Sequence, residues 1–286
     1  MTLRTYIPRI KNGRRLAGFF AVLATVLTLT CVCSGWREPA AGSQIDARYP
    51  ILLELFTSEG CSSCPPVDAW VEKLNSAQPI ANAQLIVLSE HVDYWDQDGW
   101  KDPYSSGSLT ARQSDYARKL GIPDVYTPQL ILGGSTELHL NNPQQVQQAF
   151  NQAAAPPAVS VRIDSIKVES GSPNILEGHV EVSANPNVRR GDVYVAVALD
   201  HAASQVLKGE NQGRDLSYVN VVEELAKVGK LEKGKSFDND FHVKLEPGSG
   251  SKDLNVIAFV QEPGPGKVIG ATMDKNVSQS PATSGN

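Results

Sequence analysis

The segment Ile51–Pro66, with the sequence ILLELFTSEGCSSCPP, joins a short apolar run to two cysteines and two prolines. The apolar run predicts a buried strand. Proline is favoured in the first turn of a helix, so Pro65-Pro66 predicts a helix that begins directly after the second cysteine. The segment therefore puts Cys61 and Cys64 at the point where a strand turns into a helix.

Outward from this segment, the sequence predicts an α/β domain over residues 49–155. Apolar residues recur at spacings of three and four from Val67 to Leu74, which is typical of a helix. The later elements are expected as a strand at 85–88, a helix at 109–120, a strand at 129–132, its hairpin partner at 136–140 and a helix at 143–154. The expected order is strand, helix, strand, helix, strand, strand, helix.

A second, mostly-β region is expected beyond Ala155-Pro156-Pro157, where the periodicity changes. Apolar and polar residues alternate from Val159 to Val168, and further short apolar runs are separated by turn residues. This pattern favours a small β-sandwich over residues 158–276. One helix is predicted within it, from Val219 to Val228. The small, polar tail 277–286 is expected to be disordered.

The N-terminus predicts export. Basic residues between Arg4 and Arg15 are followed by an apolar run from Leu16 to Cys33, the layout of a secretory signal peptide over residues 1–35. A polar linker over residues 36–48 would follow. The apolar run is also close to the shortest length for a membrane-spanning helix, so a retained N-terminal anchor is the alternative. We expect a periplasmic or secreted protein.

Composition limits the partners further. The 286 residues carry a net charge of −5 and are 41% hydrophobic, which is typical of a globular protein without a basic surface for nucleic acid. Two of the four cysteines, Cys31 and Cys33, lie in the presumed signal peptide. The mature chain would keep Cys61 and Cys64, and bridging so short a loop removes little chain entropy. The pair is therefore better explained by reactivity than by stability.

Two thiols separated by two residues can close into a disulfide. At a helix N-terminus, unpaired N–H groups and the helix dipole favour the thiolate, so the pKa of Cys61 should fall below the usual value of about 8.5. Cys64 should be more buried and should resolve the mixed disulfide. The alternatives are an inert short disulfide and half of a metal site, since the motif supplies two of the four usual zinc ligands.

The order of these features resembles the thioredoxin fold: a strand, a Cys-x-x-Cys motif that opens a helix, and Thr127-Pro128 just before a later strand. The resemblance covers about residues 49–154 and implies a central mixed sheet flanked by helices. In that family a cis-proline faces the dithiol and helps to hold the substrate backbone, a role that the resemblance assigns to Pro128. The alternative is an ordinary turn proline.

A narrower resemblance rests on the segments 56–66, 91–95 and 126–129. They are similar to a secreted bacterial family of domains of unknown function with a thioredoxin-like core. The pair Ser62-Ser63 departs from the Gly-Pro or Pro-His of well-studied oxidoreductases. Residues at these positions help to set the reduction potential, so the direction of electron flow stays open. Glu59 would oppose thiolate formation if it lay close to Cys61, but we expect it to be solvated.

Three further features carry alternatives. His91 could donate a proton or could join the cysteines as a ligand for copper or zinc, or it could be a hydrogen-bonded structural histidine. Tyr94, Trp95 and Trp100 could line a substrate groove or could pack a long loop. The segment Gly209–Arg214, polar and bounded by glycines, could be a recognition loop or a plain connection.

The leading hypothesis is an exported thiol–disulfide oxidoreductase that acts on thiols and disulfides of envelope or secreted proteins without a cofactor. The alternatives are a protein that binds copper or another soft metal through the same cysteines, and a non-enzymatic envelope interaction module. Enzymatic activity therefore stays open. The residues expected to act in exchange are Cys61, Cys64 and Pro128, with Thr127, Tyr94 and Trp95 contacting the substrate.

Overall fold

The computed structural model describes residues 48–169, 173–245, 253–275 and 277–279. The predicted signal peptide or anchor, and all of the predicted linker except Arg48, lie outside these residues. The first described strand, β1 (Tyr49–Thr57), is almost wholly buried and is central in its sheet. Its apolar run therefore forms the buried strand that the sequence predicts.

The first half of the chain confirms the predicted order of elements. After β1 come α1 (Pro65–Ala77), β2 (Ala83–His91), α2 (Gly107–Leu120), β3 (Gln129–Leu132), β4 (Thr136–Leu138) and α3 (Pro143–Ala153). β1 pairs in parallel with β2 and antiparallel with β3. The end of β1 and the start of β3 consequently lie at the same edge of the sheet, since Phe56 pairs with Gln129.

The second half consists of strands. They are β5 (Val161–Glu169), β6 (Ile175–Val182), β7 (Arg190–Gln205), β8 (Asp215–Glu232), β9 (Phe237–Lys244), β10 (Leu254–Gln261), β11 (Val268–Asp274) and β12 (Ser278–Gln279). The helix predicted from Val219 to Val228 is wrong, because this segment lies within β8 and pairs with β7. Of the tail 277–286, which the sequence predicts to be disordered, residues 277–279 are described and contain β12, and residues 280–286 lie outside the described residues.

The strands form two sheets. The larger, mixed sheet has the order β11-β10-β7-β8-β2-β1-β3-β4, and the smaller sheet has the order β12-β5-β6-β9. Side chains from both sheets share one hydrophobic core in the second half, including Val180, Val195 and Val256. The two halves do not form separate sheets, because β8 pairs in parallel with β2 through Val221 and Ser89. The fold is mixed α/β and mostly strand.

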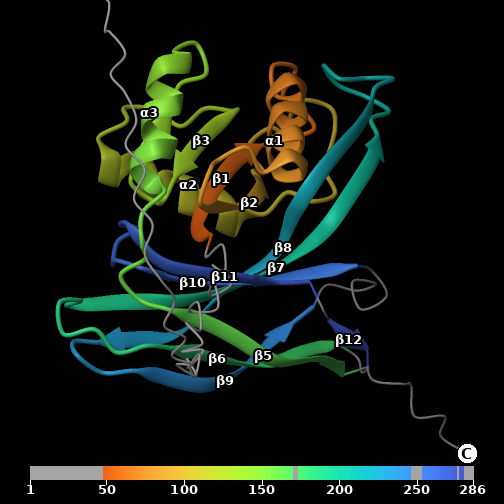
Figure 1. The fold of residues 1–286 in the computed structure, drawn as a ribbon. Coiled ribbons are helices and arrows are strands. Elements are labelled where there is room, and N and C mark those ends of the chain that lie inside the picture. The colour runs from red at the N-terminus through yellow and green to blue at the C-terminus, as the bar shows by residue number, and fades with distance from the viewer. Residues whose placement is uncertain (1–47, 170–172, 246–252, 276, 280–286) are drawn as a thin grey trace, which may run out of the picture. The chain divides into compact units, whose positions relative to one another are not determined.

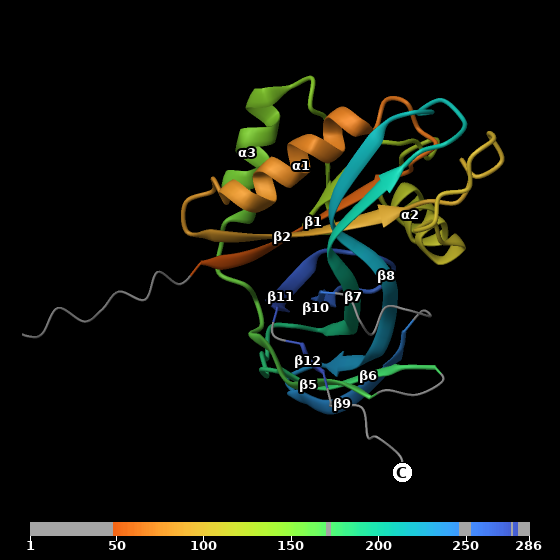
Figure 2. The same ribbon diagram turned by 90° about the vertical axis from the view of Figure 1, so that its right-hand side faces the viewer.

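The β7–β8 hairpin brings the second half to the cysteines. From the large sheet it extends alongside α1, as Figures 1 and 2 both show. The Ser217 hydroxyl in β8 donates to the Glu72 carboxylate in α1 across 3.1 Å. The loop that joins the two strands, Val206–Arg214, therefore lies at the same end of the molecule as the N-terminus of α1.

Candidate active site

Cys61 and Cys64 form a disulfide in the turn between β1 and α1, with their Cα atoms 5.5 Å apart. The Cys61 N–H donates to the Ser58 carbonyl, and the Cys64 N–H donates to the Cys61 carbonyl, both across 3.2 Å. Cys64 is the N-cap residue of α1, and Pro65 follows in its first turn. The strand-to-helix corner predicted from the sequence is confirmed.

The first turn of α1 does not offer the free N–H groups expected to stabilise a Cys61 thiolate. Pro65 and Pro66 have no N–H, and the Val67 N–H donates to the Cys64 carbonyl across 2.8 Å. The expectation of unpaired N–H groups in this turn is therefore wrong, while the N-terminus of α1 still follows directly after Cys64. A hydroxyl is available instead, because Ser63 Oγ lies 3.4 Å from Cys61 Sγ.

Both cysteines are 0% exposed, although Cys61 was expected to be the more accessible of the two. The physical reason includes a long-range contact. Asn211, in the loop between β7 and β8, is itself 0% exposed and donates from Nδ2 to the carbonyls of Glu59 and Cys61, each across 2.9 Å. Glu210 Oε2 accepts from the Ser62 N–H across 3.3 Å. The polar segment singled out in the sequence thus lies against the cysteine turn.

Thr127 and Pro128 lie directly before β3, at the edge where β1 ends, and the bond between them is cis, as expected. Trp95 connects this bend to the cysteine turn. Its Nε1 donates to Thr127 Oγ1 across 2.8 Å, and a Cβ atom on Gly60 would lie 3.0 Å from its Cβ. Tyr94 and Trp95 are half-buried and pack against a buried aromatic and aliphatic cluster. Their contact with a substrate stays a prediction.

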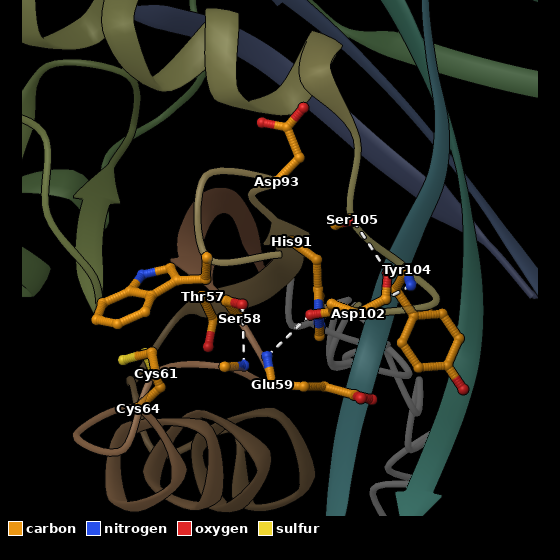
Figure 3. Close-up of polar contacts among 12 residues, drawn as sticks. Thr57, Ser58, Glu59, Cys61, Cys64, His91, Asp93, Asp102, Tyr104 and Ser105 are labelled. Atoms are coloured by element: carbon orange, nitrogen blue, oxygen red, sulfur yellow. Dashed lines mark hydrogen bonds and ion pairs between the residues drawn. A yellow bond between two sulfur atoms is a disulfide. The ribbon is translucent and has the colours of Figure 1, made fainter. Parts of the chain in front are cut away.

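A buried histidine–carboxylate pair lies behind the cysteine turn (Figure 3). His91 Nδ1 is 2.7 Å from Asp102 Oδ2, and the same oxygen accepts from the Glu59 N–H. Burial alone would lower the pKa of His91, but the Asp102 carboxylate, assisted by Asp68 and Glu59, raises it above its ordinary value. Burial would raise the pKa of Asp102, but His91 and the backbone donors lower it. His91 is thus a buried histidine that is hydrogen-bonded to Asp102, and each group favours the charged form of the other.

His91 does not complete a metal site with the cysteines. In the described part of the chain, one group of three histidine, cysteine or acidic side chains is close enough to hold a metal ion. It consists of His179, Glu181 and Asp238, on β6 and β9. His91 instead faces the ring of Tyr218, with the ring centroids 4.6 Å apart. With the disulfide closed, His91 therefore does not share a group of close ligand atoms with the two cysteines in the described part of the chain.

Two buried carboxyl groups complete the site. Glu59, expected to be solvated, is 0% exposed, and its Oε2 accepts from Trp100 Nε1 across 2.6 Å. Burial and, secondarily, Asp102 raise the pKa of Glu59. In α1, Asp68 accepts from Thr57 Oγ1 across 2.8 Å, and burial raises its pKa to about 7.

Sequence reasoning missed Asp68 and Asp102, and it singled out the segment that contains Asn211 without predicting its contact with the cysteine turn. Asp68 lies three residues before Val71, on the helix face that packs inward, so a polar residue on an apolar face was an available signal. Asp102 lies in a loop, and Asn211 is 150 residues from Cys61. Local pattern contains no signal for a partnership at such a separation.

Fold and site together define a class: a mixed α/β protein in which a buried Cys-x-x-Cys disulfide joins a central strand to a helix. A family model described as "Protein of unknown function (DUF1223)" matches residues 52–261, and the chain belongs to this family. No curated protein matches the chain.

Two solved structures are similar. A crystal structure of an Agrobacterium tumefaciens protein is 26% identical, covers 82% of this chain and 98% of its own, and superposes with a TM-score of 0.59. HBP35 of Porphyromonas gingivalis is 16% identical over 84% of this chain and 79% of its own, also with a TM-score of 0.59. The second likeness concerns the fold alone.

No helix in the described part of the chain is both long and apolar enough to cross a bilayer.

Proposed function

We propose that this chain is an exported protein with a thioredoxin-like arrangement around Cys61 and Cys64, and that it exchanges thiols and disulfides with proteins of the cell envelope. One observation carries the proposal: two cysteines are joined where a buried central strand meets a helix, and Thr127-Pro128 lies at the same edge of the sheet. The basic and apolar N-terminus supports export.

In the reducing direction, the Cys61 thiolate attacks one sulfur of a partner disulfide. A bond forms between Cys61 and the partner, and the second partner sulfur leaves as a thiolate that takes up a proton. Cys64 then loses its proton and attacks Cys61, which closes the internal disulfide and releases the first partner sulfur as a thiolate. Two electrons pass to the partner. The oxidising direction is the reverse of these steps.

Burial of the sulfurs separates this proposal from an inert disulfide. Exchange requires a sulfur to be reached in line with the bond that breaks, so the groups that cover Cys61 must move before each reaction. The turn itself is at the surface, because Ser62 and Ser63 are exposed. A small displacement of the surrounding side chains can therefore open a path to Cys61.

The test is the redox equilibrium of the full chain in glutathione buffers, together with trapping by Cys64→Ser. We expect a reduction potential between about −270 and −120 mV, the range of known exchange proteins, and mixed disulfides through Cys61 in the Cys64→Ser variant. The matched control, Cys61→Ser with Cys64→Ser, should form none. A potential below about −300 mV, typical of a structural disulfide, would overturn the proposal.

A further inference from the structure

We infer that the cap loop, Val206–Arg214, occupies the docking site of the partner, and that an extended polypeptide backbone replaces Glu210 and Asn211 there during exchange. The inference rests on the proposed function and names its substrate class. It concerns the surface that the partner contacts, beyond the two sulfurs that react.

The cap loop binds the backbone of the cysteine turn. Asn211 Nδ2 donates to the carbonyl oxygens of Glu59 and Cys61, and Glu210 accepts from the Ser62 N–H. Two acceptors and one donor of the turn are therefore satisfied by side chains from a distant hairpin. An extended polypeptide presents N–H and C=O groups along its edge, so it can supply both kinds of partner.

The cap loop is closed on itself and anchored at its base, where Val206 is 0% exposed in the hydrophobic core. Its own backbone is closed by hydrogen bonds from Val206 N–H to the Arg214 carbonyl and from Gly213 N–H to the Val206 carbonyl. Besides the bonds of Glu210 and Asn211, it approaches the loop after β2 at Gly209, where a Cβ atom would lie 3.3 Å from Asp98 O and Trp100 Cβ. Displacement of the residues beyond Val206 breaks these contacts and leaves the internal bonds of the loop intact.

The closed contact is also incomplete. Asn211 is fully buried, yet its Oδ1 has no hydrogen-bond partner in the structure. A buried oxygen without a hydrogen-bond donor costs free energy, so Asn211 Oδ1 destabilises the closed state, in which the cap loop lies on the cysteine turn. The free energy needed to open the cap loop is consequently smaller than the three hydrogen bonds of Asn211 and Glu210 alone would give.

Two segments of this site carry an exposed apolar side chain. Among the described residues, the large hydrophobic side chains that stand out as exposed are Leu207, at 60%, and Tyr126, at 39%. Leu207 belongs to the cap loop, and Tyr126 directly precedes Thr127-Pro128. Exposed apolar groups beside a backbone-binding strip are typical of a surface that receives a peptide segment.

The experiment measures how fast dithiothreitol reduces the disulfide of the full chain. Asn211→Ala should be reduced several-fold faster than the unmodified protein, because Cys61 is uncovered more often. Glu210→Ala should act in the same direction and tests the loop without emptying a buried position. Gln212→Ala is the matched control, since Gln212 lies exposed in the same loop, and its rate should not change.

A second measurement tests the polypeptide backbone. In Cys64→Ser, the Cys61 thiolate should attack a symmetrical peptide disulfide and release one peptide thiol, which leaves the other peptide in a mixed disulfide with Cys61. This mixed disulfide should be several-fold more populated than that formed from the same peptide disulfide N-methylated beside its cysteines. Equal populations, or equal reduction rates for Asn211→Ala and Gln212→Ala, would overturn the inference. If glutathione equilibrates with the disulfide above about −300 mV in either case, the proposed function survives while the docking inference fails.

Discussion

Ser63 contributes the hydroxyl that lies 3.4 Å from Cys61 Sγ, while the first turn of α1 has no free N–H to offer. The buried Glu59 precedes Cys61 by two positions, but its carboxylate extends away from the sulfurs and accepts from Trp100 Nε1 (Figure 3). We therefore expect the reactivity that we propose for Cys61 to depend on the Ser63 hydroxyl inside the Cys-x-x-Cys motif.

We predict that Ser63→Ala raises the pKa of Cys61 in the reduced protein. Loss of one hydrogen bond to a charged sulfur costs about 1.5 kcal/mol, which corresponds to about one pKa unit. The measurement is the pH dependence of alkylation in a Cys64→Ser background. Ser62→Ala is the control, because Ser62 is exposed and its hydroxyl makes no described contact with either sulfur. Identical titration curves for the two variants would contradict this assignment.

For single residues, the sequence predicts which side chains can react with each other, but it does not predict how deeply those side chains are buried. The spacing of Cys61 and Cys64 predicted that the two can form a disulfide, because the motif itself specifies which atoms can join. The burial of Cys61 could not be predicted, because Asn211 reaches it from another part of the chain. Glu59 was misjudged for the same reason, since its hydrogen-bond donor Trp100 lies in a separate loop.

Helix α1 carries an ionisable group on its buried face. Asp68 is held between α1 and the end of β1 by Thr57, and its second oxygen has no hydrogen-bond partner. Burial raises the pKa of Asp68 from 3.8 to about 7, so the folded protein retains this proton more tightly than the unfolded chain. The packing of α1 on β1 is therefore sensitive to pH.

We predict that Asp68 makes the protein more stable in mild acid. Its contribution is fully present below pH 3.8 and is lost as the pH rises through about 7. Each pKa unit corresponds to about 1.4 kcal/mol, so the dependence should reach a few kcal/mol. Urea unfolding from pH 4 to pH 8 should show a flatter curve for Asp68→Asn than for the unmodified protein. Parallel curves would remove Asp68 as the cause.

Strands could be predicted where the alternation or the apolar run lies within the strand itself. A strand was missed where pairing with another strand outweighs the helix propensity of its residues. The alternation of apolar and polar residues in β5 and the apolar run of β1 each predicted a strand, and both strands form. Residues 219–228 contain glutamate, leucine, alanine and lysine, which favour a helix, but continuous pairing with β7 makes them part of a strand of 18 residues. No local window contains β7 and β8 together.

For the molecule as a whole, strand pairing and side-chain hydrogen bonds connect the two halves in addition to the peptide chain. β2 and β8 share the large sheet, and Arg112 in α2 donates to Glu54 in β1 and to Gln261 in β10. The expected boundary at residues 155–157 follows a true change in periodicity. It could not reveal that hydrogen bonds cross it, since those bonds join residues more than a hundred positions apart.

We predict that the described unit unfolds in one cooperative transition. Calorimetric and van't Hoff enthalpies should agree, and tryptophan fluorescence should change at the same temperature as far-ultraviolet circular dichroism. Arg112→Met leaves the Glu54 carboxylate buried without its cation, so it should lower stability by about 3–5 kcal/mol without splitting the transition. Lys73→Met, on the surface of α1, is the control. Two separated transitions would show that the halves fold independently.

The separation between Cys61 and Asn211 has a consequence for synthesis. The chain is made from its N-terminus, so the cysteine turn emerges while the residues that shield it, 150 positions later, do not yet exist. At about 5–20 residues per second, this interval lasts on the order of ten seconds. A newborn chain thus offers its sulfurs to any oxidant at hand, and the finished molecule restricts that access.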